Sequence, residues 1–457
     1  MGKGVIDVER IFYWMHRDTK CTTIKISSTT NAVYFTNHTD QHLLCAFGKE
    51  VSPVNMDDFY DLLETRIAPI REQVDDRKTY RMIGCSKLPT IEYLISQTYG
   101  MIADDFFWIC EEENTYSFDD IRDAVGLQCP EPTDLKSLKE HKFTEEEMYG
   151  IPYLTTRASQ PKWVYKGWFI KKDRWGYESM AEMLCSILAK YVRGIQALDY
   201  ILLPPIDGRG VCASPLYTDR LSCEFVSFWN IITKSNRYEE LPPANLNGGM
   251  DLLEKVIQIV SEETGMNMDT YIRKMLMWDA LILNTDRHYN NMAVRRSNTG
   301  QYTPMPFFDH GLSLLSGYSM NDLTEVRARV YTQSFSQYVE LAGKDNMLEI
   351  DMVGFCEHLD KLRAYYKEHQ GYYAHYFNKV STILITRLLD TKGTIWKAVG
   401  REAYTINTSH YLEWQLSNGF NGKDYKEEVE KFQRAMKTFD EKTCLTTNKE
   451  DMAYGRH

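Results

Sequence analysis

Paired cysteines and long apolar runs are both missing from this sequence. Its ten cysteines are scattered singly, so no two stand at the CxxC spacing that zinc and redox sites use. No stretch of ~18 apolar residues occurs. The first residues, up to Trp14, also lack the apolar segment and the cleavage site of a secretory signal. These absences predict a protein of the reducing cytoplasm that is neither secreted nor inserted in a membrane.

Positive charge is in short supply as well. The 457 residues include 53 lysines and arginines against 64 aspartates and glutamates, a formal net charge of −11. That mean field repels a polyanion such as DNA, so we expect no direct contact with nucleic acid. Runs rich in Pro, Ser or Gly and repeats of about 20 to 50 residues are also absent, which predicts closely packed lobes without long linkers.

The first part of the chain mixes strand and helix patterns. Residues 1–150 contain short strand-like runs at 22–26 and 32–34, and an amphipathic helix is predicted after Asn55. The polar, charge-rich stretch 131–147 marks a domain boundary near its end. No catalytic constellation is visible in this part.

A hairpin followed by a helix is predicted next. The runs 163–165 and 168–171 are strand-like, and Lys166 with Gly167 forms a two-residue turn in which glycine supplies a positive φ. A helix with an apolar stripe follows from about Ser179. Farther on, 223–226 is read as a strand that leads into a helical lobe. Helices are predicted there near 250–263, 268–283, 349–368 and 372–390.

Hydrogen-bonding side chains crowd together where the helix near 268–283 ends. A hairpin of strands 292–296 and 301–308 is predicted to follow, and prolines in its second strand indicate an edge or bulged strand. Its return brings Asp309 beside Asn291. We therefore expect Asp286, Asn291 and Asp309 to meet at one point.

Such a cluster suits phosphoryl transfer. Mg²⁺ prefers carboxylate and amide oxygens, which Asp309 and Asn291 supply, and a carboxylate such as Asp286 can orient an attacking hydroxyl and accept its proton. The alternative is a solvated turn, because Asp, Asn and Thr are common in any loop between helix and strand. His288 is expected to orient the loop by hydrogen bonds rather than to bind a metal, since no second His or Cys stands at ligand spacing.

The motifs resemble those of the HipA-like Ser/Thr kinases. Asn-Thr-Asp-Arg-His-x-x-Asn at 284–291, followed by Phe-Phe-Asp-His-Gly at 307–311, is the order found in this branch of the protein-kinase-like fold. Phosphatidylinositol kinases share its Asp-Arg-His-x-x-Asn loop. The segment 155–163 looks like the phosphate-covering loop of the family, and the resemblance spans about 155–390.

The resemblance implies roles for individual residues. Asp286 corresponds to the catalytic base, and Asn291 and Asp309 to the magnesium ligands. Lys171 corresponds to the lysine that grips the phosphates, with His288 beside the base. Further residues are implied to contact ATP: Lys162 and Ser159 in the phosphate loop, Glu182 as the partner of Lys171, and Glu224 and Val226 as backbone contacts of adenine. Glu178 lies one helical turn from Glu182 and competes with it for Lys171.

One departure from the family lies in the phosphate loop. Residues 155–162 contain no glycine, although close approach of a backbone to phosphate is easiest with glycine. Ser159 stands in the segment where some family members phosphorylate themselves, which would add negative charge to the loop. Ordinary local hydrogen bonds of loop hydroxyls are the alternative.

The fold class implied is α+β, a two-lobed protein-kinase-like fold. Its parts are a family-specific α/β segment at 1–150, a nucleotide-binding lobe at 151–228, a helical catalytic lobe at 229–400 and a C-terminal helical extension at 401–457. The implied activity is ATP- and Mg²⁺-dependent transfer of phosphate to a protein Ser/Thr hydroxyl.

Three alternatives stay open at this stage. The acceptor could be a lipid headgroup or small molecule, because phosphoinositide kinases share the loop. The chain could instead be a pseudokinase that binds nucleotide without turnover, or a toxin-like component held by an antitoxin partner. In the kinase reading, a loop at 312–341 that includes Tyr331 and Thr332 faces the acceptor.

Overall fold

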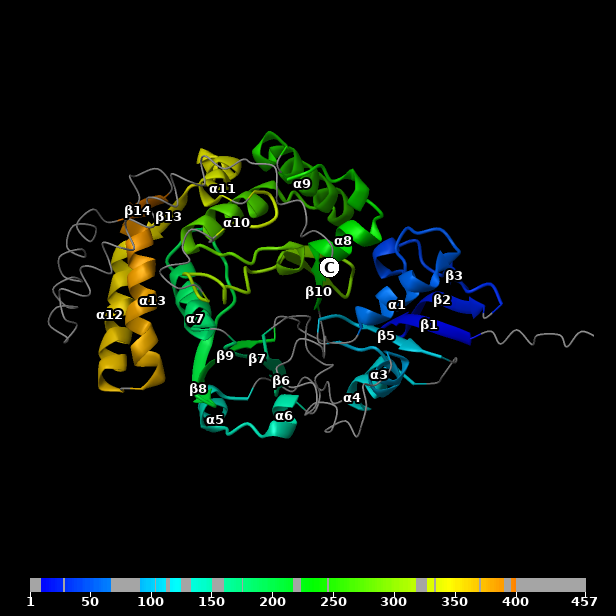
Figure 1. Ribbon diagram of the computed structural model, residues 1–457, viewed down its shortest axis with the longest axis horizontal. Coiled ribbons are helices and arrows are strands. Elements are labelled where there is room, and N and C mark those ends of the chain that lie inside the picture. Colours follow the sequence, from blue (N-terminus) through cyan, green and yellow to red (C-terminus); the bar gives the residue numbers. More distant parts are fainter. Residues whose placement is uncertain are drawn as a thin grey trace, which may run out of the picture.

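The computed structural model describes residues 10–27, 29–66, 91–102, 104–111, 116–124, 133–149, 160–174, 176–216, 223–244, 246–317, 327–332, 334–369, 371–389 and 396–399. These residues form a mixed α/β structure of several sheets and a large helical part (Figure 1). None of the helices in these ranges is long and apolar enough to cross a membrane.

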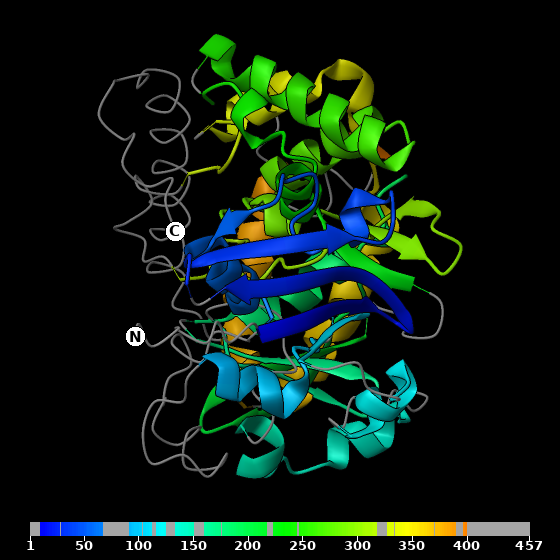
Figure 2. The ribbon, with the colours of Figure 1, turned by 90° about the vertical axis from the view of Figure 1, so that its right-hand side faces the viewer.

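An antiparallel sheet of five strands, in the order β4-β3-β2-β1-β5, forms the N-terminal part. The strands are β1 (Arg10–His16), β2 (Thr19–Ser27), β3 (Ala32–Asn37), β4 (Val54–Asn55) and β5 (Phe107–Cys110). Figure 2 looks onto this sheet. The predicted helix is α1 (Met56–Glu64), which Asn55 and Asp58 cap reciprocally. The other helices here are α3 (Ile91–Thr98) and α4 (Phe118–Ala124).

A second sheet, in the order β6-β7-β9-β8, contains the predicted hairpin. Its strands are β6 (Lys162–Tyr165), β7 (Trp168–Lys172), β8 (Ile201–Ile206) and β9 (Arg209–Pro215). Lys166 and Gly167 have φ of 41° and 79°, the left-handed values that a tight hairpin turn requires, so the predicted turn is confirmed. The helices α5 (Leu135–Glu140) and α6 (Glu145–Tyr149) pack on this sheet through Leu138 and Met148.

The helix α7 (Glu178–Ala189) follows the hairpin and is buried along its whole length. It contacts β8 and β9 on one side. On the other side its apolar residues, such as Leu184 and Leu188, belong to the same core as Leu276 and Trp278 of the helical part. This placement lets a polar side chain on α7 reach both the sheet and the loops of the helical part.

A third sheet joins β10 (Cys223–Ser227), β11 (Ala293–Ser297) and β12 (Tyr302–Pro304). The prediction of a strand over 301–308 was too long, because pairing with β11 ends at Pro304. Pro304 and Pro306 have no N–H to donate to a ladder, which accounts for the short strand. The chain then runs on to Asp309.

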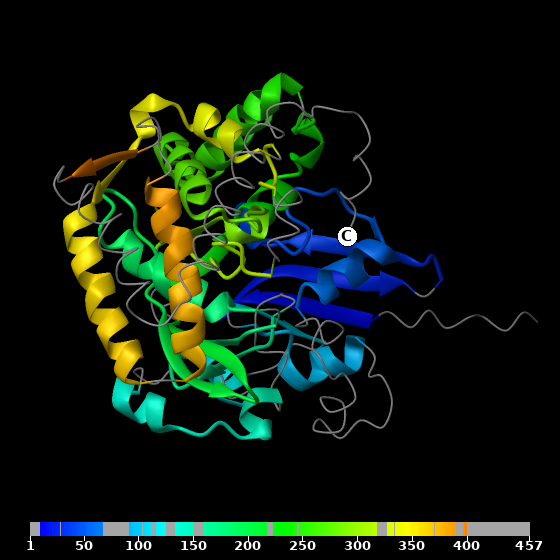
Figure 3. The same cartoon turned by 60° about the vertical axis from the view of Figure 1, so that its left-hand side comes forward.

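The helical part consists of α8 (Phe228–Lys234), α9 (Met250–Thr264), α10 (Asp269–Ile282), α11 (Phe335–Ala342), α12 (Met352–Glu368) and α13 (Tyr372–Leu389). Figure 3 shows α12 and α13 side by side. The start predicted for the helix at 349 was wrong, because Leu348–Asp351 forms β13, parallel to β14 (Trp396–Val399). Asp351 then caps α12 by accepting the N–H of Gly354.

Candidate active site

The loop after α10 is shaped by side-chain hydrogen bonds. The helix ends at Ile282, and Leu283 turns the chain with a left-handed φ of 55°. Asn284 then accepts the backbone N–H of Asp286 at 3.0 Å, and its own Nδ2 donates to Asp279 at 3.0 Å. The position of Asp286 is therefore fixed from within the preceding buried helix.

Arg287 holds this loop in place by hydrogen bonds, and its side chain is completely buried. Its guanidinium donates to both carboxylate oxygens of Asp279, at 2.8 and 3.0 Å. Its Nη1 also donates to the carbonyls of Asn291, at 2.6 Å, and Phe308, at 3.1 Å. Because one nitrogen holds both carbonyls, Asn291 and the residue after Phe308 are brought together. The one signal of this contact in the sequence was an aspartate, Asp279, within the otherwise apolar run 275–282.

Lys171, Glu182 and Asp309 meet in the interior although three separate segments carry them. The Nζ of Lys171 lies 2.5 Å from Oε1 of Glu182 and 2.7 Å from Oδ1 of Asp309. Lys171 is on β7 and Glu182 on α7, so the hairpin-then-helix order of the sequence creates the pair. Glu178, the competing candidate, instead accepts two backbone N–H groups of the loop before α7.

The electrostatics of this cluster favour the charged forms of Lys171 and Asp309, whereas burial raises the pKa of Glu182. Burial raises the pKa of Asp309, but the positive charges of Lys171 and Lys162 outweigh that effect and hold the pKa well below its usual range. Burial also opposes the charge of Lys171, yet Asp309 and Glu182 keep its pKa above the ordinary value. For Lys162 burial prevails and lowers the pKa to about 8. At neutral pH the cluster thus contains an ionised Asp309 facing a charged Lys171.

His310, directly after Asp309, is a second residue that sequence reasoning missed. It is fully buried, its backbone N–H donates to Oε2 of Glu182 at 2.8 Å, and its Nε2 accepts the indole N–H of Trp278 at 3.1 Å. Burial lowers the pKa of His310 well below its usual value, so the ring is neutral. Asp309 itself has a left-handed φ of 59°. His310 thereby fixes the turn that directs Asp309 toward Lys171.

Asp286 lies at the rim of the cluster with its side chain partly exposed. Its Oδ1 accepts from Nη1 of Arg329 at 2.6 Å, and Nε2 of His288 is 3.8 Å from the same oxygen, beyond hydrogen-bond range. The Nδ2 of Asn291 donates to the backbone carbonyl of Asp286 at 2.9 Å. Burial raises the pKa of Asp286, while the charges of His288 and Arg329 oppose that rise.

The oxygen donors of Asn291 and Asp309 bear on the binding of Mg²⁺. Within the part of the chain that the structure describes, no group of three or more His, Cys, Asp or Glu side chains could hold a metal ion. Mg²⁺, however, is ordinarily bound by one or two carboxylates together with substrate phosphates. Asn291 uses its amide nitrogen on Asp286, which leaves the amide oxygen for a cation, and Asp309 is an ionised oxygen donor. These two residues fit a magnesium ion that also binds phosphate.

A cavity of about 510 Å³ adjoins the cluster. Lys162, Lys171, Asn291 and Asp309 are among the residues that line it. The aromatic rings of Phe169, Tyr200, Phe225 and Phe308 contribute apolar walls, and side chains of the N-terminal sheet region, among them Trp14, Arg66 and Phe107, line the rest. The size is within the usual range of small-molecule sites.

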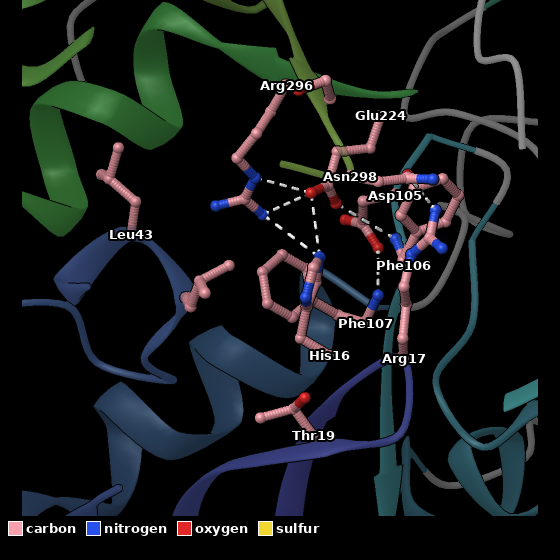
Figure 4. A network of polar contacts seen from close by, with 12 residues as sticks. His16, Arg17, Thr19, Leu43, Asp105, Phe106, Phe107, Glu224, Arg296 and Asn298 are labelled. Atoms are coloured by element: carbon pink, nitrogen blue, oxygen red, sulfur yellow. Dashed lines mark hydrogen bonds and ion pairs between the residues drawn. The ribbon is translucent and has the colours of Figure 1, made fainter. Parts of the chain in front are cut away.

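Glu224 is not part of the Lys171 cluster. Figure 4 shows its carboxylate between Arg296 and His16, with Oε1 2.6 Å from Nε of Arg296 and 2.9 Å from Nε2 of His16. Oε2 accepts the N–H of Phe106 at 3.3 Å. Burial alone would raise the pKa of Glu224, but Arg296 and His16 lower it to about 2. The side chain therefore joins the N-terminal sheet to β10 and β11.

The backbone of β10 bears on the predicted adenine contact. Phe225 donates its N–H away from β11, to the carbonyl of Asp104 at 2.9 Å. Because backbone groups alternate in direction along an antiparallel strand, those of Glu224 and Val226 point toward β11, where they pair with Arg296 and Val294. Their contact with adenine stays a prediction, and this pairing does not support it.

Two further expectations concern Ser159 and the loop at 312–341. Ser159 lies outside the described residues, as does the rest of the glycine-free stretch before Gln160. The orientation of the loop at 312–341 toward an acceptor stays a prediction, but Tyr331 within it does not point outward. Its side chain is completely buried, with the hydroxyl 3.7 Å from the sulfur of Met292. An apolar ring of that size is more stable in the core than on an open loop.

No protein-family model and no curated protein sequence matches this chain. Among solved structures, a kinase of Helicobacter pylori described as proinflammatory, CtkA, matches with a TM-score of 0.38 and 15% identity, over 55% of this chain and 91% of its own. HipA of Shewanella oneidensis, solved with HipB and operator DNA, matches with a TM-score of 0.40 and 10% identity, over 96% of this chain and 100% of its own. The family named from the sequence motifs is thus also present among the structural neighbours of this chain.

Proposed function

We propose that this chain is a HipA-like kinase that transfers the γ-phosphate of ATP to a Ser or Thr hydroxyl of a protein. The observation that carries the proposal is the buried contact of Lys171 with both Glu182 and Asp309, at 2.5 and 2.7 Å. An ionised lysine that contacts two acidic side chains and lines a cavity is suited to bind a polyphosphate.

The reaction assigns a task to each residue. Lys171 and Lys162 bind phosphate oxygens, and Asp286 orients the acceptor hydroxyl and takes its proton. Asn291 and Asp309 would hold Mg²⁺, which supplies electrostatic stabilisation of the phosphate oxygens when bound. The rings of Phe169, Phe225 and Phe308 would provide apolar contacts for the adenine of ATP. They replace the backbone groups of Glu224 and Val226 that the resemblance implied.

The proposal includes the organisation predicted from the sequence. Residues 151–228 form a nucleotide lobe and 229–400 a catalytic lobe, with flanking segments at 1–150 and 401–457. A cytoplasmic location and a regulatory partner of the antitoxin type belong to it as well. The absence of glycine from the stretch 155–162 is the observation that favours the pseudokinase alternative, since close approach of a backbone to phosphate is easiest with glycine.

Phosphate transfer to the chain itself and to dephosphorylated casein tests the function. Purified protein is incubated with Mg²⁺ and γ-labelled ATP, and the label is followed together with intact mass. We expect transfer by the wild type and its loss in Asp286→Asn and Asp309→Asn, which keep the size of each side chain. Both variants must retain the wild-type melting temperature.

The outcomes separate the alternatives. ATP binding without any transfer supports the pseudokinase reading, whereas absence of both binding and transfer rejects the nucleotide site. Transfer to phosphoinositide vesicles but not to protein supports a lipid kinase. Transfer that persists in Asp286→Asn shows that another group acts as the base.

A further inference from the structure

Arg329 is the one side chain in the described part of the chain that hydrogen bonds to the carboxylate of Asp286. Its Nη1 is 2.6 Å from Oδ1, and its own side chain is 56% exposed. The motif that identified Asp286 ends at Asn291, so Arg329 comes from a segment almost forty residues farther along the chain. A contact at such a separation depends on how that segment is held.

Contacts with the buried core hold the backbone around Arg329 in place. Its carbonyl accepts the hydroxyl of Tyr338, a fully buried side chain of α11. The next residue, Val330, has a φ of 80°, a left-handed value that costs a β-branched residue free energy, and Tyr331 is completely buried. These contacts fix the backbone position from which the side chain of Arg329 reaches Asp286.

The two oxygens of Asp286 differ in their surroundings. Oδ1 faces Arg329 at 2.6 Å and His288 at 3.8 Å. No hydrogen bond reaches Oδ2 from any residue that the structure describes. A charged donor on one oxygen restricts rotation of the carboxylate and leaves the second oxygen as the acceptor.

We propose that Arg329 is a positioning residue that holds Asp286 by Oδ1, so that Oδ2 is directed at the acceptor hydroxyl. This role rests on the proposed kinase function. In the transfer step the hydroxyl oxygen forms a bond to the γ-phosphorus, and the bond from that phosphorus to the bridging oxygen breaks. The electron pair of the broken bond leaves with ADP, and the hydroxyl proton passes to Oδ2.

The test uses the full chain with Arg329→Met, which removes the donors, and Arg329→Lys, which keeps a charge and a donor. Arg193→Met is the matched control, because Arg193 forms an exposed ion pair with Glu349 at 2.9 Å. Rates are measured with γ-labelled ATP, Mg²⁺ and dephosphorylated casein. We expect kcat of Arg329→Met to fall ~10- to 100-fold with the KM for ATP unchanged, and Arg329→Lys to recover part of the loss.

Each other outcome overturns the role. An unchanged kcat in Arg329→Met shows that the contact has no function, and a raised kcat shows that Arg329 covers the base instead of orienting it. A fall in kcat accompanied by a lower melting temperature or a higher KM for ATP shows a merely structural role. If the wild type transfers no phosphate, the kinase function itself fails, and this role fails with it.

Discussion

The guanidinium of Arg287 and the carboxylate of Asp279 are paired through two hydrogen bonds, at 2.8 and 3.0 Å, and neither side chain is exposed. The pair connects helix α10, which carries Asp279, to the loop after that helix, which carries Arg287. Nη1 of Arg287 also donates to the carbonyls of Asn291 and Phe308. The guanidinium of this one arginine therefore sets the relative position of the two segments that carry Asn291 and Asp309.

Replacement of Asp279 by Ala is expected to destabilise the protein by about 3–5 kcal/mol, because it leaves the charge of Arg287 buried without a partner. Urea unfolding measures the change in free energy. Arg193→Met, at an exposed ion pair, is the control and is expected to cost less than about 1 kcal/mol. A loss in Asp279→Ala no larger than in this control contradicts the prediction.

Glu182→Gln is expected to raise the KM for ATP by roughly tenfold, because Lys171 loses the charge that holds it in place. Glu178→Gln is the matched control on the same helix. Its amide oxygen can still accept one of the two backbone N–H groups of the loop before α7, and Lys171 keeps both Glu182 and Asp309, so the KM is expected to stay near that of the wild type. Equal effects of the two substitutions would show that the Lys171 contact is not specific. The measurement is the ATP dependence of label transfer.

Stability is expected to depend on pH through Asp173. Burial, with Glu178 nearby, raises the pKa of this aspartate from 3.8 to about 7. The folded chain thus keeps a proton that the unfolded chain releases, so stability falls as pH rises from about 4 to about 7 and is level above. Between about pH 5 and about pH 7 the fall amounts to about 2–3 kcal/mol.

Asp173→Asn tests this dependence. The amide oxygen can still accept the N–H and hydroxyl of Ser179, which Asp173 accepts in the wild type. The variant lacks the titrating group, so the pH-dependent fall should disappear. Unfolding midpoints in urea at the two ends of the pH range give the comparison. A fall of the same size in both proteins assigns it to another group.

Glu224 should stabilise the attachment of the N-terminal sheet. Its folded pKa of about 2 lies below the ordinary 4.5, so its contribution is present above about pH 4.5 and is lost as pH falls toward 2. Glu224→Gln removes the charge that faces Arg296 and His16 at any pH. We expect faster hydrogen exchange in β1 and β5 of this variant than in the wild type, with exchange in α13 unchanged.

The local parts of the fold were accessible from the sequence. The hairpin before Lys171 follows from a two-residue turn, and the helix with Glu182 follows from an apolar stripe, so the Lys171–Glu182 pair could be named as one of two choices. Whether Glu178 or Glu182 pairs with Lys171 depended on which of the two glutamates faces the sheet. The spacing from Asp286 to Asn291 and the return to Asp309 likewise follow from one loop and one hairpin.

Contacts between distant segments were not accessible. Nothing near Arg329 in the sequence indicates Asp286, because the contact depends on Val330 and Tyr338. The only sign of the buried pair of Arg287 and Asp279 in the sequence was one aspartate within the apolar run 275–282. The side-chain contacts of Glu224 were not accessible for the same reason, since its partner His16 lies about two hundred residues earlier in the chain. Pattern reasoning sees neighbours along the chain, and these groups are neighbours only after folding.

Side chains of the N-terminal sheet region and of the Lys171 cluster line one cavity. Occupancy of that cavity and the association of the two regions are therefore linked equilibria. A ligand at about 100 times its Kd adds about 2.7 kcal/mol to the stability of both regions together. A genetic screen for lost ligand affinity should thus recover substitutions at Trp14 or Phe107 as readily as at Lys171. Selection for ligand binding therefore also constrains the sequence of the N-terminal sheet, although the kinase-like motifs lie outside it.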